Sequence, residues 1–207
     1  MTGAVTRSYV STARMSHMEW LAARQGGIGG SDAAALVLGQ NVYKWHRPID
    51  VYRSKVYELP EEEESLACRM GHFLEPFVAD LFTEETGFRV HRWNRMLTSS
   101  EFPWAFANID RKLRGYDRGL ECKTCSAYRD KQFDDEIFPP EYYVQIQHYL
   151  AVTGWDTWYL AALIGNKRFV WYTVPRNDED IKEIMEREEA FWEIIVNKNE
   201  EEAEQWL

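Results

Sequence analysis

The chain has 207 residues, of which 45% are hydrophobic and 14% aromatic. This length suffices for one well-buried domain and is short for two, so we expect a single domain over residues 1–207, with its core from about residue 20 to 195. No apolar run approaches the roughly 20 residues needed to cross a membrane, and the N-terminal stretch lacks an apolar signal-peptide core, so we expect a cytoplasmic protein without a membrane partner.

The net charge of −10 is concentrated at one end of the chain. Residues 178–207 hold 12 acidic and 3 basic side chains, which leaves 22 acids and 21 bases in residues 1–177. Within this nearly neutral body, residues 89–131 carry ten Lys or Arg against five Asp or Glu. A local basic segment of this kind, and not the total charge, governs phosphate binding. The acidic tail, residues 197–207, is expected to be solvated and disordered.

The three cysteines are Cys68, Cys122 and Cys125. Their odd number and lack of framework spacing predict reduced thiols. Cys122 and Cys125 do form a C-x-x-C pattern, but the second cysteine pair of a zinc or iron–sulfur site is missing.

Two helices are predicted in the first forty residues. The first covers Ser16 to Gln25 and ends at two glycines. The next begins in the glycine-rich run before Ser31, which we expect to be its N-cap. Free N–H groups at such a terminus attract anions, so a phosphate can bind there beside Arg24. The alternative is that the serine only caps the helix.

A short helix from Pro48 to Lys55 and an exposed acidic stretch, Glu61 to Glu64, precede a long amphipathic helix over Ser65 to Thr86. Its apolar residues recur every three or four positions and predict a broad buried stripe. Glu75 lies between stripe positions and precedes Pro76, which bends a helix and exposes polar groups. Glu75 is therefore either a surface acid or a carboxylate directed at a metal site.

The second half of the chain alternates strands and helices. Residues 88–98, 104–110 and 119–124 are predicted to form a three-stranded meander, and residues 155–164 and 168–174 a hairpin. Helices are expected over 141–152, where Tyr142, Gln145 and Tyr149 share one face, and over 177–199. The consistent architecture is an α/β fold (α+β mixed sheet), a central mixed sheet flanked by helices.

The strand at 119–124 carries the best candidate for a catalytic site. Side chains alternate along a strand, so Glu121 and Lys123 share one face. The turn-rich loop from Arg114 to Gly119 can return the chain antiparallel and bring Asp110 next to them. Asp117 is a rival for Asp110, but it lies inside the loop. A plain surface ion pair between Glu121 and Lys123 is the alternative.

Two carboxylates and a lysine suit metal-dependent phosphodiester cleavage. Carboxylate oxygens bind Mg²⁺ together with water and phosphate oxygens. The ion polarises the phosphate and activates water, while the lysine orients that water or neutralises the charge that develops on phosphorus.

Taken in order, these motifs resemble the YqaJ-like viral recombinases, which include the phage lambda-type exonuclease and have the PD-(D/E)xK restriction-endonuclease-like core. The resemblance covers roughly residues 20–195 and rests on five pieces: the Gly-Gly-Ile-Gly-Gly-Ser-Asp-Ala run at 26–33, Met70-Gly71 with Glu75, Asp110, Glu121-x-Lys123, and Tyr142-x-x-Gln145-x-Gln147-His148-Tyr149.

The resemblance implies a role for each matching residue. Asp110, Glu121 and the backbone carbonyl of Cys122 would bind the metal, Glu75 a second metal or its water, and Lys123 would be the catalytic lysine. Gln145, with Tyr142 one turn before it, would lie beside the scissile phosphate. Arg24 and Ser31 would meet DNA near a recessed 5′ end.

The implied activity is Mg²⁺-dependent 5′-to-3′ digestion of double-stranded DNA, with Mn²⁺ as a substitute. The implied partners are duplex ends, a single-strand annealing protein that receives the 3′ strands, and two further copies in a trimeric ring, in the host cytoplasm if the gene belongs to a phage. Two alternatives remain: a PD-(D/E)xK endonuclease or resolvase-like nuclease using the same acids, and a non-catalytic recombination accessory or DNA mimic.

Overall fold

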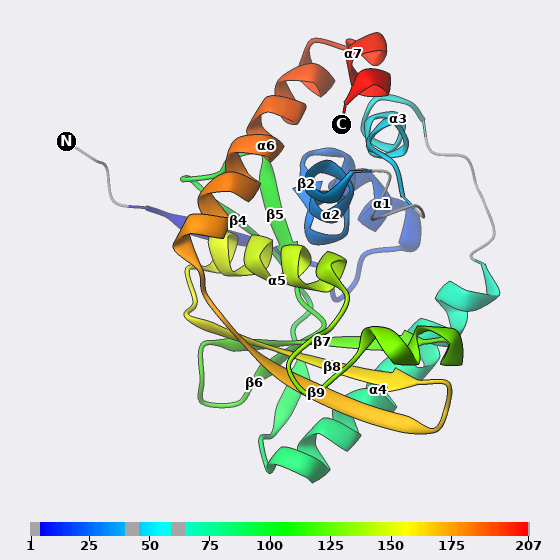
Figure 1. Cartoon of the computed structure of the whole chain (residues 1–207). Helices are drawn as coiled ribbons and strands as arrows, with labels where there is room; N and C mark the ends of the chain where they lie inside the picture. The colour runs from blue at the N-terminus through cyan, green and yellow to red at the C-terminus, as the bar shows by residue number, and fades with distance from the viewer. Residues whose placement is uncertain (1–4, 40–45, 59–64, 207) are drawn as a thin grey trace.

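The computed structural model describes residues 5–39, 46–58 and 65–206, arranged as two sheets with helices between and around them (Figure 1). The predicted acidic stretch Glu61–Glu64 lies outside these residues. In the described part of the chain, no helix has the length and apolar character required to span a bilayer.

The larger sheet has five strands in the order β3-β6-β7-β8-β9. Their bounds are β3 Val90–Arg92, β6 Arg111–Leu113, β7 Arg118–Cys125, β8 Thr157–Ile164 and β9 Arg168–Pro175. All neighbours are antiparallel except β7 and β8, which are parallel. The hairpin predicted across Gly165-Asn166 is confirmed by the antiparallel pairing of β8 and β9. Both turn residues have positive φ, as a two-residue turn between twisted strands requires.

A second sheet has the order β1-β4-β5-β2, with β1 Arg7–Ser11, β4 Arg95–Ser99, β5 Ala105–Asn108 and β2 Ile28–Gly29. The predicted meander is therefore wrong. Residues 90–99 form two short strands, β3 and β4, that belong to different sheets. Only tertiary pairing decides this division, because a strand pattern does not identify its partner. Strand β1 was not predicted either.

Most of the predicted helices are confirmed, with ends shifted by a few residues at most. They are α1 His17–Gln25, α3 Pro48–Val56, α4 Leu66–Thr86, α5 Pro140–Thr153 and α6 Asp178–Val196. Their starts follow local chemistry: the side chains of Ser16, Ser65 and Asn177 accept bonds from the first turns of α1, α4 and α6, and Pro140 occupies the first turn of α5.

Helix α5 lies between the five-stranded sheet and the group formed by α2 (Gly30–Leu38), α3 and α6, whereas α4 covers the other face of the sheet (Figure 1). Alternate side chains of β8 (Thr157–Ile164) face the helices on the two sides of the sheet. Trp158, Leu160 and Ala162 belong to the core shared with α5, and Tyr159 and Ala161 to the core shared with α4.

The apolar stripe predicted along α4 is buried only in its second half. Val78, Ala79 and Phe82 are buried, but Leu66, Phe73 and Phe77 are 71%, 76% and 50% exposed. The expectation of one continuous buried stripe is thus wrong, because the described residues cover only the C-terminal part of the helix.

The acidic tail is also ordered, contrary to expectation. Residues Glu200–Gln205 form helix α7, capped by Asn199. Arg53 of α3 bonds Glu200 and Glu204, and the indole of Trp206 donates to the carbonyl of Leu36 at 3.0 Å. An aromatic anchor and a cationic neighbour therefore order a segment whose composition alone suggested disorder.

Candidate active site

The predicted alternation in β7 is confirmed. Glu121 and Lys123 project toward α5, and Lys123 Nζ lies 2.6 Å from Glu121 Oε1. Cys122 projects the other way and packs against the core under α4, as a free thiol does. Gly119, on the Glu121 face, is needed because a Cβ there would lie 2.2 Å from the Trp158 ring.

Asp110 reaches the same place through the predicted hairpin. Strand β6 pairs antiparallel with β7, with Arg111 opposite Leu120. Asp110 Oδ2 accepts a bond from the Cys122 backbone N–H at 3.0 Å. Asp117, the rival, lies at the far end of the hairpin, where its exposed side chain pairs with Lys112 at 2.8 Å.

Helix α5 contributes Gln145, which joins the two charged groups. Its Nε2 donates to Glu121 Oε1 at 2.7 Å, and its Oε1 accepts from Lys123 at 3.0 Å. The same Nε2 is 2.9 Å from the Tyr149 hydroxyl. The predicted face of α5 is thus confirmed, and Gln147 and His148 point elsewhere, to the Pro175 carbonyl and to Glu188.

Tyr142 lies one turn before Gln145 and forms part of the same wall. Its ring is 5.2 Å from Lys123 Nζ and 5.4 Å from the guanidinium of Arg129. Arg129 donates to the Tyr142 hydroxyl at 3.1 Å and also bonds Glu141. Nothing local distinguishes Arg129 from the other cations of the basic segment 89–131, because it lies in a short 3₁₀ segment, η1 (Ala127–Gln132).

Glu75 comes from α4 and faces the cluster, so the reading of it as a plain surface acid does not hold. Its carboxylate bonds the guanidinium of Arg111, which also donates to the Asp110 carbonyl at 2.9 Å. Arg111 is 6% exposed and was likewise missed. In the part of the chain that the structure describes, no three His, Cys, Asp or Glu side chains converge closely enough to hold a metal ion together.

The electrostatics of the cluster favour an additional cation. Burial raises the pKa of Asp110 well above its usual range, and the nearby charges of Glu121 and Glu75 raise it further, against Lys123 and the Cys122 N–H. Glu121 is 3% exposed, and its Oε2 has no hydrogen-bond partner among the described residues. Two close carboxylates with a buried oxygen to spare form a donor set that fits a hard divalent ion.

These groups line a cavity of about 810 Å³. Its walls include Glu75, Asp110, Glu121, Lys123, Tyr142 and Gln145, together with Arg24 and Ser31. The structure therefore brings all of the predicted site residues to one cavity. Of the basic segment at 89–131, Lys123 and Arg129 line this cavity, whereas Arg111 is buried beneath it.

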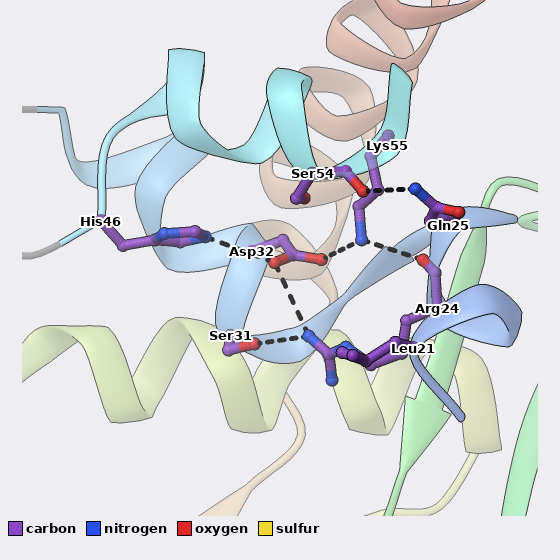
Figure 2. Close-up of a pocket in the computed structure, with 8 residues that line it drawn as sticks. All are labelled: Leu21, Arg24, Gln25, Ser31, Asp32, His46, Ser54 and Lys55. Carbon is purple, nitrogen blue, oxygen red and sulfur yellow. Dashed lines mark hydrogen bonds and ion pairs between the residues drawn. The ribbon is translucent and has the colours of Figure 1, made fainter. Parts of the chain in front are cut away.

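Arg24 and Ser31 also border a second cavity of about 290 Å³ (Figure 2). Arg24 donates to the Ser31 hydroxyl at 3.2 Å. The prediction that Ser31 caps α2 is wrong. Gly29 is the N-cap, because β2 ends there, and the Asp32 carboxylate accepts from the Gly29 N–H at 3.0 Å. The hydroxyl of Ser31 is thus not used in capping.

Asp32, Lys55 and His46 also line this second cavity, and the sequence predicted a binding role for none of them. Lys55 Nζ lies 2.8 Å and His46 Nε2 3.4 Å from the Asp32 carboxylate. Lys55 comes from α3, 23 residues from Asp32. Asp32 lies in the glycine-rich run at 26–33 and in the first turn of a helix, where an Asp is ordinary capping chemistry.

Comparison with known proteins agrees with this geometry. The model of the YqaJ-like viral recombinase domain family matches residues 19–156. The uncharacterized protein YqaJ of Bacillus subtilis (strain 168) is 40% identical over 195 residues, which cover 93% of this chain and 60% of that protein. The chain thus spans less than two thirds of the length of its curated relative.

Two solved structures are similar in fold. The alkaline exonuclease LHK-Exo from Laribacter hongkongensis superimposes with a TM-score of 0.69 at 20% identity, covering 90% of this chain and 96% of that one. A phage related exonuclease from Haemophilus somnus 129PT gives 0.59 at 12% identity, covering 83% and 96%. The predicted fold class, a mixed α/β core of the PD-(D/E)xK type, is confirmed.

Proposed function

The chain belongs to the YqaJ-like viral recombinase domain family, and from that premise we propose that it is a Mg²⁺-dependent exonuclease that digests the 5′ strand of duplex DNA. The observation that carries the proposal is the cluster of Asp110, Glu121 and Lys123 in one cavity, with a buried carboxylate oxygen that lacks a partner among the described residues.

The residues that would hold Mg²⁺ are Asp110, Glu121 and the backbone carbonyl of Cys122, with Glu75 as the acid for a second ion or its water. The chemistry supplied by the bound ion is polarisation of the scissile phosphate and activation of water. Mn²⁺ can substitute, because it accepts the same oxygen ligands.

Lys123 would act on the water and on the developing charge. Glu121 and Gln145 hold its ammonium in place, so the group is preoriented before DNA binds. Preoriented charge stabilises a transition state more than a mobile one does, because no reorganisation is needed during the reaction. Gln145 would contact the scissile phosphate beside Tyr142, and Gln145 also links the lysine to the metal-binding acid.

Arg24 and Ser31 would bind the 5′-terminal phosphate. Both border the smaller cavity and also the main cavity, which Asp110 and Glu121 line as well. Holding the strand end there would position the scissile bond in the cavity lined by Asp110 and Glu121, and correct positioning of a reacting group raises the rate. Internal phosphodiesters carry less charge and would bind there more weakly.

Family membership also supports a larger assembly, in which three copies form a ring around DNA in the host cytoplasm and pass 3′ single strands to an annealing protein. Light scattering after size-exclusion chromatography tests the trimer independently of the chemistry.

The test of the activity uses linear duplexes labelled at either end, with a 5′-phosphate or a 5′-hydroxyl, and closed circular DNA, each with Mg²⁺ or with EDTA. We expect Mg²⁺-dependent loss of the 5′ label, faster on the phosphorylated duplex, and no cutting of the circle. Arg24→Ala or Ser31→Ala should narrow the difference between the two linear substrates. Cutting of the circle would favour an endonuclease, and the absence of any metal-dependent loss would favour a non-catalytic role.

A further inference from the structure

The second cavity contains a charge that phosphate binding does not require. Asp32 is 3% exposed and lies between the cations of the pocket (Figure 2). A carboxylate beside a site for an anion repels that anion unless another group compensates its charge. The arrangement around Asp32 shows which group does so.

The two oxygens of Asp32 have different partners. Oδ2 accepts from the Gly29 N–H at 3.0 Å and from Lys55 Nζ at 2.8 Å. Oδ1 is 3.8 Å from Arg24 and 3.4 Å from His46. Arg24 is therefore outside hydrogen-bonding distance of Asp32, and the same nitrogen bonds Ser31 instead.

Arg24 is held in that position by groups other than Asp32. Its guanidinium lies 4.8 Å from the Trp20 ring and 5.6 Å from the Phe106 ring. Lys55 donates a second bond, at 2.9 Å, to the backbone carbonyl of Arg24. The lysine thus fixes both the carboxylate and the segment that carries the arginine.

Lys55 itself is too enclosed to be the main phosphate ligand. Its side chain is 3% exposed, whereas that of Arg24 is 22% exposed. Burial opposes the charge of Asp32, but Lys55, a hydrogen bond from His46 and Arg24 together hold the pKa of Asp32 well below its usual range. The pocket therefore contains a buried, hydrogen-bonded ion pair between Lys55 and Asp32, and a more accessible guanidinium, Arg24, that lies 3.8 Å from the same carboxylate.

We propose that Lys55 is a positioning residue of this pocket, which occupies the Asp32 carboxylate and so leaves the Arg24 guanidinium available to a 5′-terminal phosphate. The inference rests on the proposed function. Counting Arg24, Lys55 and Asp32, the pocket has a net charge of +1. Without Lys55 the sum is zero, and Asp32 draws Arg24 from 3.8 Å into hydrogen-bonding distance.

The test measures the ratio of digestion rates on 5′-phosphorylated and 5′-hydroxyl duplexes, and the ratio of their affinities in EDTA. Lys55→Met should lower both ratios about tenfold, the range of one charge-assisted hydrogen bond. Asp32→Asn, whose amide oxygen still accepts from Gly29, should raise the affinity ratio. The double variant Asp32→Asn with Lys55→Met removes both charges, restores the sum to +1 and should recover the preference.

The rescue separates positioning from direct contact. If Lys55→Met keeps the wild-type ratios, or if the folded double variant fails to recover them, the inference is wrong. Circular dichroism checks folding. If Lys55→Met alone does not fold, the double variant still decides, because direct contact by Lys55 predicts loss of preference there and positioning predicts recovery. A wild-type protein without phosphate preference would instead contradict the phosphate pocket of the proposed function.

Discussion

Two glutamates of this protein, Glu121 and Glu188, are buried to a similar degree but lie in different surroundings. Glu121 and Glu188 are 3% and 0% exposed, and in each the Oε2 atom has no hydrogen-bond partner within the described residues. Helix α5 supplies a partner for each Oε1 atom: Gln145 at 2.7 Å from Glu121 and His148 at 2.7 Å from Glu188.

The surroundings separate them. Glu121 lies beside Asp110 and Lys123 on the wall of a large cavity. Glu188 is enclosed in the core with His148, whose other nitrogen donates to the Phe106 carbonyl at 2.9 Å. A buried acid alone therefore does not indicate a reaction site. A group of like charges at an accessible cavity does indicate one, because a cation that enters from solvent relieves their repulsion.

The largest effect is expected at the accessible cluster. Lys123→Ala should lower the rate of metal-dependent strand loss about a thousandfold, because in the proposed mechanism the lysine would act on the nucleophile and the transition state. Duplex binding in EDTA, measured by anisotropy, should be largely retained. Activity within about tenfold of the parent, roughly 1.4 kcal/mol in barrier, would remove Lys123 from the mechanism.

The next effect concerns the acids. Asp110→Asn and Glu121→Gln should each lower Mg²⁺ affinity and cleavage together, by about a hundredfold or more in rate, because several kcal/mol of charge stabilisation would depend on the proposed ion. In EDTA the unfolding temperature of Asp110→Asn should rise, because a buried like charge is removed. Asp117→Asn is the matched control and should stay active. The reverse pattern would assign the role to Asp117.

Substitutions in the enclosed pair, His148 and Glu188, should change the stability of the fold and not the cleavage rate. Glu188→Ala leaves Nδ1 of the buried His148 without its charged partner and should lower the free energy of unfolding by about 3–5 kcal/mol. Glu188→Gln should cost less, because its amide can still donate to a neutral His148. Urea unfolding measures both. A large loss of cleavage rate per folded molecule in Glu188→Gln would show that the two clusters are coupled through α5.

The smallest effect is a pH dependence of the enclosed pair. Burial opposes protonation of His148, but the charge and hydrogen bond of Glu188 and the Phe106 carbonyl raise its pKa above the ordinary value. A raised pKa means that the native state keeps its proton above about pH 6.5, where the unfolded chain loses it. Stability should therefore fall as pH rises from about 6.5 through the native pKa, by at most about 1.4 kcal/mol per pH unit. Glu188→Gln should lack this slope, and an unchanged slope would show that another group causes it.

Much of the site could be predicted because its signals are local. The alternation of β7 places Glu121 and Lys123 on one face, and a turn-rich loop brings Asp110 beside them. Helical spacing places Tyr142 and Gln145 together on α5. These are properties of neighbouring residues, so composition and periodicity suffice to predict them.

The remaining features depend on contacts between distant parts of the chain. Arg111 bonds Glu75 across 36 positions, and Trp206 reaches Leu36 across 170. The same dependence explains the wrong predictions. The packing partner decides whether the apolar side of α4 is buried, whether an acidic tail is ordered, and which sheet a strand joins. The sequence by itself determined which side chains share a face, because backbone geometry fixes that within a few residues. Only the tertiary structure decided which charges are paired and which are open to the cavity, because burial and pairing depend on elements far away in the chain.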